Sequence, residues 1–269
     1  MTATPISEPS HWLTDLSASA RLALSCLDLT SLNAEDTEAD IARLCERAQS
    51  PFGPVAAVCV WPRLAAFARR QLPAHIAVAA VANFPDGGFD VQRAVRDTAE
   101  IVQSGAQEVD VVMPYARLLS GNETSVAQLL SAVRAACPGL LLKVILETGE
   151  LKDPALIARA SHLSLDAGAD FLKTSTGKTT ASATPEAART MLNAIAAHSS
   201  AMGRVGFKPS GGIRIVADAA VYMALTSEIL GPQALNPQRF RLGASSVLTD
   251  IEAILGGQSQ PVAARFGAY

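Results

Sequence analysis

Lysine is scarce in this chain, and the few positions where it occurs are the best guide to possible chemistry. Of the 22 basic residues, five are lysines and 17 are arginines. Arginine stays charged near neutral pH, whereas a buried or crowded lysine can lose its proton and act as a nucleophile. Three of the lysines, Lys173, Lys178 and Lys208, lie in two short segments, FLKTSTGK and GFKPSGG. An amine at the end of an apolar strand, followed by hydroxyl and glycine residues, predicts Schiff-base chemistry on a phosphorylated carbonyl compound.

The elements that would position these lysines follow a regular alternation. Eight strands are predicted from aliphatic or β-branched runs, at 22–28, 55–61, 76–83, 108–113, 140–147, 171–174, 205–208 and 240–243. Helices are predicted at 37–48, 90–104, 123–136, 154–167, 185–198 and 217–230. Such alternation implies parallel strands joined by right-handed crossovers. Eight units in 269 residues are typical of an α/β fold of the single (β/α)8 TIM-barrel type. A doubly wound open sheet is the alternative, but no G-x-G-x-x-G follows the first strand.

Composition limits the class of protein. We expect one domain over residues 1–269, with a short lead-in over about 1–18 and a mobile tail over about 256–269. A net charge of −3 and 5% aromatic residues argue against nucleic-acid binding. No apolar run reaches membrane-spanning length, and the N-terminus lacks the pattern of a secretory signal. The four cysteines form no C-x-x-C pair, so reduced thiols and a cytoplasmic location are expected.

The histidines give no support for a metal site. All four are scattered, and none belongs to an H-x-H or H-x-x-x-H pattern. A zinc-dependent lyase needs clustered imidazole ligands, so that alternative is disfavoured and neither a metal nor another cofactor is expected.

Four ionisable groups stand at the carboxyl ends of predicted strands, where a barrel of this kind gathers its chemistry. They are Asp28, Asp110, Lys173 and Lys208. Because alternate strand residues point inward, we expect these two carboxylates and two amines to meet at one end of the barrel. A set of structural ion pairs is the alternative interpretation. Lys143 lies deeper on its strand, so we interpret it as a supporting ion-pair partner and not as the nucleophile.

Three loops after the last predicted strands are suited to an anion. Residues 175–178 offer hydroxyls, backbone N–H groups and an amine, and residues 210–212 place two glycines where backbone can approach an oxyanion. Residues 243–246 open the last expected helix, whose N–H groups would face an anion. Each loop taken alone is more often an ordinary turn, but together they predict a phosphate site.

At these residues the chain resembles the deoxyribose-phosphate aldolases, a class I aldolase family with the (β/α)8 fold. The resemblance runs from about Leu22 to Tyr269. It is carried by LDLT, VCVWPR, NFPDG, EVDVVMPY, LKVILETGEL, DFLKTSTGK, VGFKPSGGIR and RLGASS. Trp61, Ser210 and Leu242 depart from the family pattern, where tyrosine, alanine and an aromatic residue are common.

The resemblance implies reversible cleavage of 2-deoxy-D-ribose 5-phosphate to D-glyceraldehyde 3-phosphate and acetaldehyde. It assigns the Schiff base to Lys173, with Asp110 and Lys208 as its partners, and an ammonium on Lys208 would favour the free amine of Lys173. Asp28 would fix the network, and Tyr269 would fold back to assist proton transfer. The expected substrate-binding residues are Thr30, Thr176, Gly177, Lys178, Gly211, Gly212, Gly243, Ser245 and Ser246. The partners expected are the phosphosugar, the aldehydes and, as a homodimer, a second copy of the chain.

Two rival functions and one side reaction complete the sequence-based expectations. A different Schiff-base barrel enzyme, such as another phosphosugar aldolase or a transaldolase, would share the amine and the phosphate loops. A non-catalytic barrel that binds phosphometabolites would not need both lysines beside Asp110. Cys59 is expected near the barrel mouth, where a lysine would lower its thiol pKa and expose it to alkylation by aldehydes; a buried core thiol is the alternative.

Overall fold

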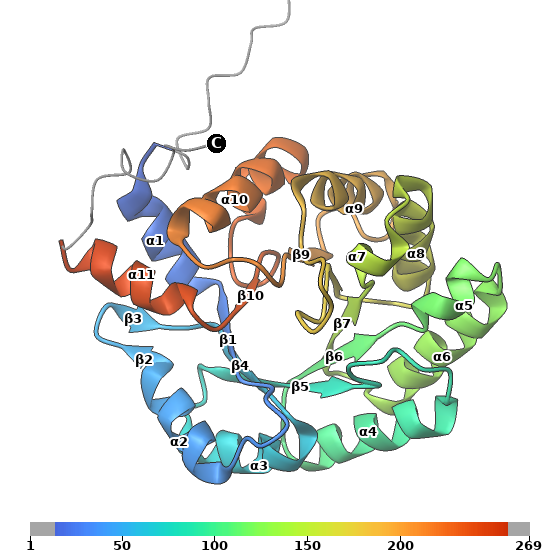
Figure 1. Ribbon diagram of the computed structural model, residues 1–269, viewed down its shortest axis with the longest axis horizontal. Helices are drawn as coiled ribbons and strands as arrows, with labels where there is room; N and C mark the ends of the chain where they lie inside the picture. Colours follow the sequence, from blue (N-terminus) through green and yellow to red (C-terminus); the bar gives the residue numbers. More distant parts are fainter. Residues whose placement is uncertain (1–13, 258–269) are drawn as a thin grey trace, which may run out of the picture.

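The computed structural model describes residues 14–257, which form a ring of eight parallel strands enclosed by helices (Figure 1). The strands are β1 (Leu27–Thr30), β4 (Ala57–Val60), β5 (Ala77–Ala82), β6 (Glu108–Val112), β7 (Leu141–Ile145), β8 (Phe171–Lys173), β9 (Gly206–Lys208) and β10 (Leu242–Ala244). Their order in the sheet is β10-β1-β4-β5-β6-β7-β8-β9. Parallel bridges between Phe207 and Phe240 and between Ser210 and Gly243 join β9 to β10 and close the ring. The predicted TIM barrel is therefore confirmed.

The helices cover the outside of the ring (Figure 1). They are α1 (Leu16–Ser25), α2 (Glu38–Arg47), α3 (Pro62–Gln71), α4 (Val91–Gln103), α5 (Tyr115–Leu119), α6 (Glu123–Ala136), α7 (Thr148–Leu151), α8 (Pro154–Asp166), α9 (Pro185–Ala197), α10 (Val216–Leu230) and α11 (Val247–Leu255). Their starts follow local chemistry: the side chains of Asp153 and Thr184 cap α8 and α9, each followed by a proline at the first helical position. A small hairpin of β2 (Gln49–Ser50) and β3 (Gly53–Pro54) stands apart from the barrel sheet. No helix within residues 14–257 is long and apolar enough to cross a membrane.

The first predicted strand began too early, and the helix between β4 and β5 was missed. Residues 22–25 were expected in the first strand, but they form the last turn of α1, which is capped by Asp15 through a bond from the backbone N–H of Ala18. A Leu- and Ala-rich run satisfies both a strand and a helix pattern over so few residues. Helix α3 was not predicted, although Pro62 occupies its first position and buried Leu64, Ala65 and Ala68 follow helical spacing.

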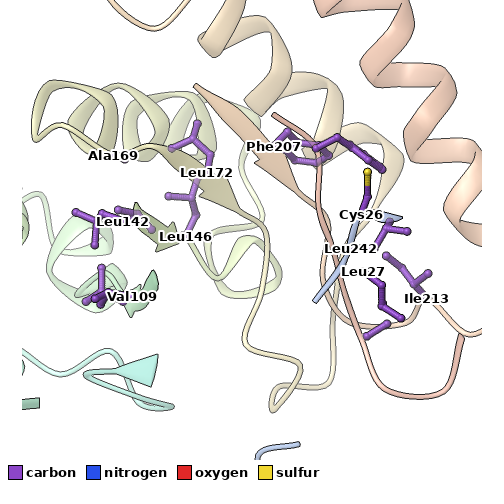
Figure 2. Close-up of a cluster of buried hydrophobic side chains, with 14 of the residues drawn as sticks. Cys26, Leu27, Val109, Leu142, Leu146, Ala169, Leu172, Phe207, Ile213 and Leu242 are labelled. Carbon is purple, nitrogen blue, oxygen red and sulfur yellow. The ribbon is translucent and has the colours of Figure 1, made fainter. Parts of the chain in front are cut away.

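Two apolar layers hold the barrel. The outer layer lies between strands and helices, and Figure 2 shows part of it, with Leu142, Leu172 and Phe207 among its side chains. The inner layer fills only part of the barrel interior, with Leu32, Cys59, Ala79, Val81, Phe84, Val112 and Ile145. Strands β4 and β5 supply only small, uncharged side chains, so the charged side chains of the interior come from the other strands.

Candidate active site

The four ionisable residues predicted at strand ends meet inside the barrel. Oδ2 of Asp110 accepts hydrogen bonds from Nζ of Lys173 at 2.9 Å and from Nζ of Lys208 at 2.8 Å. Lys208 also donates to the carboxylate of Asp28. Asp28, Asp110 and Lys208 are fully buried, and Lys173 is 2% exposed. The expected convergence of two carboxylates and two amines is therefore present in the structure.

Strand register explains why these groups meet. In the parallel ladder, Lys173 lies level with Lys208 on the next strand, and Asp110 lies level with Lys143. Side chains at one level of neighbouring strands point to the same side, which here is the barrel interior. Nζ of Lys143 accordingly lies 2.7 Å from Oδ1 of Asp110, so the expected supporting ion pair is present.

Sequence reasoning missed two members of this cluster, Glu108 and Arg241. Arg241 spans two carboxylates: its Nη1 lies 2.6 Å from Oδ1 of Asp28, and its Nη2 lies 2.7 Å from Oε1 of Glu108. The other Glu108 oxygen, Oε2, lies 2.5 Å from Nζ of Lys143. One signal was available in the sequence, because Glu108 stands two residues before Asp110 and Arg241 two before Gly243, which places each on the inward face.

For the carboxyl groups Asp28 and Asp110, attraction to neighbouring positive charges changes the pKa more than burial does. Burial alone raises the pKa of Asp110, but the surrounding lysines Lys143, Lys173 and Lys208 outweigh that effect and hold its pKa well below the ordinary value. The pKa of Asp28 is lowered in the same way, against burial, chiefly by Lys208 and then by Arg241. Two carboxylates therefore stay ionised at neutral pH.

Two of the lysines have raised pKa values for the corresponding reason. Burial lowers the pKa of Lys208, but the carboxylates of Asp110 and Asp28 outweigh it and raise that pKa above its ordinary value. The pKa of Lys143 is also raised, since Asp110 and Glu108 overcome the effect of burial. Lys143 and Lys208 are therefore ammonium ions at neutral pH.

Cys59 lies at this cluster, but its chemistry differs from the expectation. Its Sγ is 4.0 Å from Oδ2 of Asp110, and the side chain is fully buried. Burial, and after it the negative charge of Asp110, raises the pKa of the Cys59 thiol to about 11. The expected lowering by a lysine was wrong, because desolvation of a thiolate outweighs the pull of the lysines.

A cavity of about 320 Å³ opens beside the cluster, at the carboxyl ends of the strands. Its lining includes Lys173 together with all nine residues predicted to bind substrate: Thr30, Thr176, Gly177, Lys178, Gly211, Gly212, Gly243, Ser245 and Ser246. Lys143 and Lys208 are not among its lining residues. Of the three clustered lysines, Lys173 is thus the one that a molecule in the cavity can reach.

Hydrogen bonds between loops fix the shape of this cavity. Oγ1 of Thr174 donates to the carbonyl of Ser210 at 3.1 Å and accepts from its N–H at 3.0 Å. Oγ of Ser210 donates to the carbonyl of Ser175 at 2.8 Å. Gly211 has a φ of +85°, and a Cβ there would lie 2.6 Å from Oγ of Ser182, so only glycine suits this close approach. The loops after β8 and β9 are therefore joined to one another along one side of the cavity.

Glu147 anchors the loop that carries the predicted phosphate ligands. It follows β7 in a left-handed conformation (φ 56°), is fully buried, and accepts bonds from the N–H of Thr176 at 3.2 Å and from its Oγ1 at 2.5 Å. Burial raises the pKa of Glu147, although the bonds from Thr176 oppose that rise. Its role in holding Thr176 was not predicted from the sequence.

The rim of the cavity carries positive charge. Lys178 and Arg214 line it, and both are exposed. Ser246 lines the cavity, immediately precedes α11 and makes no side-chain cap, so the N-terminus of that helix lies at the cavity edge without a side-chain cap from Ser246. Arg214 was not singled out from the sequence. Tyr269 lies outside the described residues. Within residues 14–257, no group of three or more His, Cys, Asp or Glu side chains has the arrangement of a metal site.

Comparison with known proteins agrees with this geometry. Residues 22–252 match the model of the DeoC/LacD family aldolases. A deoxyribose-phosphate aldolase of Agrobacterium fabrum (strain C58) is 48% identical over 251 residues, covering 92% of this chain and 95% of the relative. The chain belongs to the DeoC/LacD family of aldolases. It is therefore a carbon–carbon lyase, as the sequence resemblance implied.

Solved structures share the fold. A Toxoplasma gondii ME49 protein, described as a candidate deoxyribose-phosphate aldolase, superposes with a TM-score of 0.83 at 24% identity and covers 92% of this chain and 97% of its own. The deoxyribose phosphate aldolase of Aeropyrum pernix, described as tetrameric, superposes with a TM-score of 0.70 at 25% identity, covering 93% and 98%. Both superpositions cover more than nine-tenths of this chain, so the whole barrel is shared.

Proposed function

We propose that this aldolase reversibly cleaves 2-deoxy-D-ribose 5-phosphate to D-glyceraldehyde 3-phosphate and acetaldehyde through a Schiff base on Lys173. The observation that carries the proposal is the position of Lys173. Its amine is the cluster lysine that borders the cavity, and it lies 2.9 Å from a carboxylate that Lys208 also contacts. The 48% identity to a deoxyribose-phosphate aldolase supports this substrate.

The reaction begins with attack on the open-chain sugar. The free amine of Lys173 adds to the C1 carbonyl, and the carbinolamine loses water to give an iminium. Asp110, whose Oδ2 is within hydrogen-bond reach of Nζ, relays the protons, directly or through a water. The C3 hydroxyl then loses its proton and becomes the carbonyl of D-glyceraldehyde 3-phosphate, which leaves as the C2–C3 bond breaks. The electron pair of that bond moves toward the iminium nitrogen and gives an enamine. Protonation at C2 and hydrolysis release acetaldehyde and restore the amine.

Lys208 favours the nucleophilic form of Lys173 in this proposal. Because the two carboxylates around Lys208 keep it protonated, it is a permanent positive charge beside the amine. A second ammonium next to it is electrostatically disfavoured, which is why we propose Lys173 as the nucleophile. Asp28 supports the arrangement through its ion pairs with Lys208 and Arg241. Tyr269 is retained as a proposed participant in proton transfer.

The phosphate would lie on the loops after β8, β9 and β10. Gly211 and Gly212 open the backbone, Ser246 stands at the start of α11, and Lys178 and Arg214 supply positive charge at the rim. Backbone N–H groups and a helix N-terminus are suited to a dianion. A cavity of about 320 Å³ is of the size used for small ligands.

The test compares the cleavage of two candidate substrates by the purified protein. We expect the purified protein to release acetaldehyde and D-glyceraldehyde 3-phosphate from 2-deoxyribose 5-phosphate, with at most about one-hundredth of that kcat/KM for a phosphorylated ketohexose. Preference for the ketohexose would favour the rival assignment, another phosphosugar aldolase. Saturable binding of deoxyribose 5-phosphate without turnover would favour a non-catalytic barrel.

Location and assembly are part of the proposal. A cytoplasmic site of action fits four cysteines that are all free and buried, together with a phosphorylated substrate. We propose a homodimer, which light scattering coupled to size-exclusion chromatography would distinguish from a monomer or a tetramer.

A further inference from the structure

The barrel interior holds seven charged or ionisable groups in direct contact, which we call the charged cluster: Asp28, Glu108, Asp110, Lys143, Lys173, Lys208 and Arg241. We propose that Glu108 and Arg241 set the protonation of Lys173 through the total charge of this cluster, without touching the substrate. The proposal rests on the Schiff-base role proposed for Lys173. Glu108 and Arg241 are then positioning residues, outside the cavity lining.

An unbroken chain of contacts links the two residues to the amine. Arg241 binds Glu108 at 2.7 Å and Asp28 at 2.6 Å. From Asp28 the chain continues to Lys208 and then to Oδ2 of Asp110, which contacts Lys173. A second route runs from Glu108 through Lys143 to Oδ1 of the same carboxylate of Asp110.

The cluster has almost no access to solvent, so its total charge matters. Glu108 and Arg241 are 3% and 6% exposed, and the other members are buried at least as completely. The cluster contains three carboxylates and four basic groups, so the charges balance when one basic group is neutral. An unbalanced charge in such an environment is costly.

Lys173 is the basic group best placed to be neutral. Arg241 does not give up its proton, and the pKa values of Lys143 and Lys208 are raised by their carboxylates. Lys173 has one ion-pair carboxylate, Asp110, whereas Lys208 has two. Lys173 also borders the cavity, which gives its proton a route to water.

Other titratable groups also face Lys173, from the elements packed around it. They come from every neighbouring element: Asp110 on β6, Lys208 on β9, Cys59 on β4 and Glu147 after β7. Cys59 has a thiol pKa of about 11 and is uncharged at neutral pH. Glu147 interacts electrostatically with Lys173, but burial raises its pKa, whereas the pKa values of Asp28 and Asp110 are lowered, so Glu147 holds its negative charge less firmly than they do. Its carboxyl is bonded to Thr176 and Thr179 on the loop after β8 and, within the described residues, makes no ion pair with the charged cluster.

The two residues therefore have opposite expected effects. Glu108→Gln removes a negative charge and keeps the shape, which disfavours the ammonium of Lys173, so the free amine should persist to lower pH. Arg241→Met removes a positive charge, which favours the ammonium, so a higher pH should be needed. The double variant restores the balance. Each single shift should be about one pH unit, as expected for a unit charge at about 10 Å and an effective dielectric constant of about 20.

The experiment follows iminium formation itself across pH. Each variant is incubated with acetaldehyde and cyanoborohydride from about pH 5 to about pH 9, and the rate of adduct formation at Lys173 is read by peptide mass mapping. We expect the acidic limb of the plot of trapping rate against pH to move to lower pH for Glu108→Gln and to higher pH for Arg241→Met. In the double variant it should return to the wild-type position.

Controls separate charge from structural damage. Arg241→Lys keeps the charge but loses the two-pronged contact, so its acidic limb should stay at the wild-type position even if its rate falls. If Arg241→Met does not fold, the downward shift in Glu108→Gln and the unmoved limb in Arg241→Lys carry the test. The inference would be overturned if the acidic limb stayed at the wild-type pH in Glu108→Gln and Arg241→Met, or if it moved in the same direction in both. An adduct absent from Lys173 in the wild-type protein would instead refute the proposed function.

Discussion

Lys173 and Lys208 donate hydrogen bonds to one and the same oxygen atom, Oδ2 of Asp110, at 2.9 and 2.8 Å. They lie level on neighbouring strands, so their proximity is a consequence of parallel register. Lys208 has a second carboxylate, Asp28, whereas Lys173 borders the cavity. The proposed mechanism accordingly gives two identical side chains different tasks, Lys208 as a fixed charge and Lys173 as the nucleophile.

Replacing Lys208 should alter the pH dependence as well as the rate. Lys208→Leu removes the fixed charge and leaves Asp110 free to stabilise an ammonium on Lys173. We expect kcat for deoxyribose 5-phosphate to fall about 100-fold and the acidic limb of the pH–rate profile to move upward by about one unit or more. Lys208→Arg, which keeps the positive charge, should leave the limb near its original pH. An unmoved limb in Lys208→Leu would show that Lys208 has only a structural role.

Asp110 should matter at the step that forms the iminium. Asp110→Asn keeps the shape of the side chain but cannot relay a proton, so trapping of acetaldehyde on Lys173 should slow by about 100-fold. Asp28→Asn is a useful comparison, because Asp28 has ion pairs with Lys208 and Arg241 and none with Lys173. Its trapping rate should fall by only about tenfold. Equal losses in the two variants would contradict a proton-relay role specific to Asp110.

Ser246 should distinguish the phosphorylated substrate from the free sugar. Ser246→Asp places a negative charge at the start of α11, where the phosphate is proposed to lie. We expect KM for deoxyribose 5-phosphate to rise about tenfold or more, and KM for deoxyribose to change by less than about twofold. Ser199→Asp, on an exposed loop that leads into β9 at the opposite end of the barrel, is the matched control. Similar changes for both sugars would place the phosphate elsewhere.

Cys59 should make the enzyme sensitive to its own product. Acetaldehyde that condenses with itself on Lys173 gives an unsaturated aldehyde, which is an acceptor for a thiol, and both Cys59 and Lys173 lie within 4.0 Å of Oδ2 of Asp110. We expect concentrated acetaldehyde to inactivate the enzyme by alkylating Cys59, whereas Cys59→Met should resist. Cys45→Ala, at a buried thiol of α2, should remain as sensitive as the wild type. Loss of activity at the same rate in Cys59→Met would show that Cys59 is only a core residue.

The raised thiol pKa limits how this reaction can occur. With a pKa of about 11, caused first by burial, Cys59 is almost entirely protonated at neutral pH. A bulky thiol reagent in solution should therefore label it slowly in the folded protein and rapidly after unfolding. Inactivation should depend on aldehyde held at Lys173, and Lys173→Met should protect Cys59 from alkylation.

Most of the barrel could be predicted from the sequence because its eight strands are short apolar runs separated by helical segments, several of which begin at a capping side chain. Helix α1 was partly misassigned, since Leu22–Ser25 fits both periods, and whether such a run is strand or helix depends on its tertiary contacts. Inward parity was enough to place Asp110 beside Lys173. It was not enough for Arg241, because that contact with Glu108 crosses the barrel interior and exists only once the ring has closed.

Glu108 and Glu147 were not predicted as site residues, for different physical reasons. Glu108 stands at the first position of β6, where side chains usually serve stability, and its partners come from β7 and from the residue preceding β10. The bonds of Glu147 to Thr176 depend on a left-handed conformation that no local residue preference indicated.

The central claim is that Lys173 carries the covalent intermediate, and reductive trapping tests it most directly. The wild-type protein is incubated with acetaldehyde, reduced with borohydride and digested, and the peptides are mapped by mass. The account predicts one stable two-carbon adduct on Lys173 in the peptide containing DFLKTSTGK, and none in Lys173→Met. An adduct on Lys143 or Lys208, or full trapping in Lys173→Met, would contradict it.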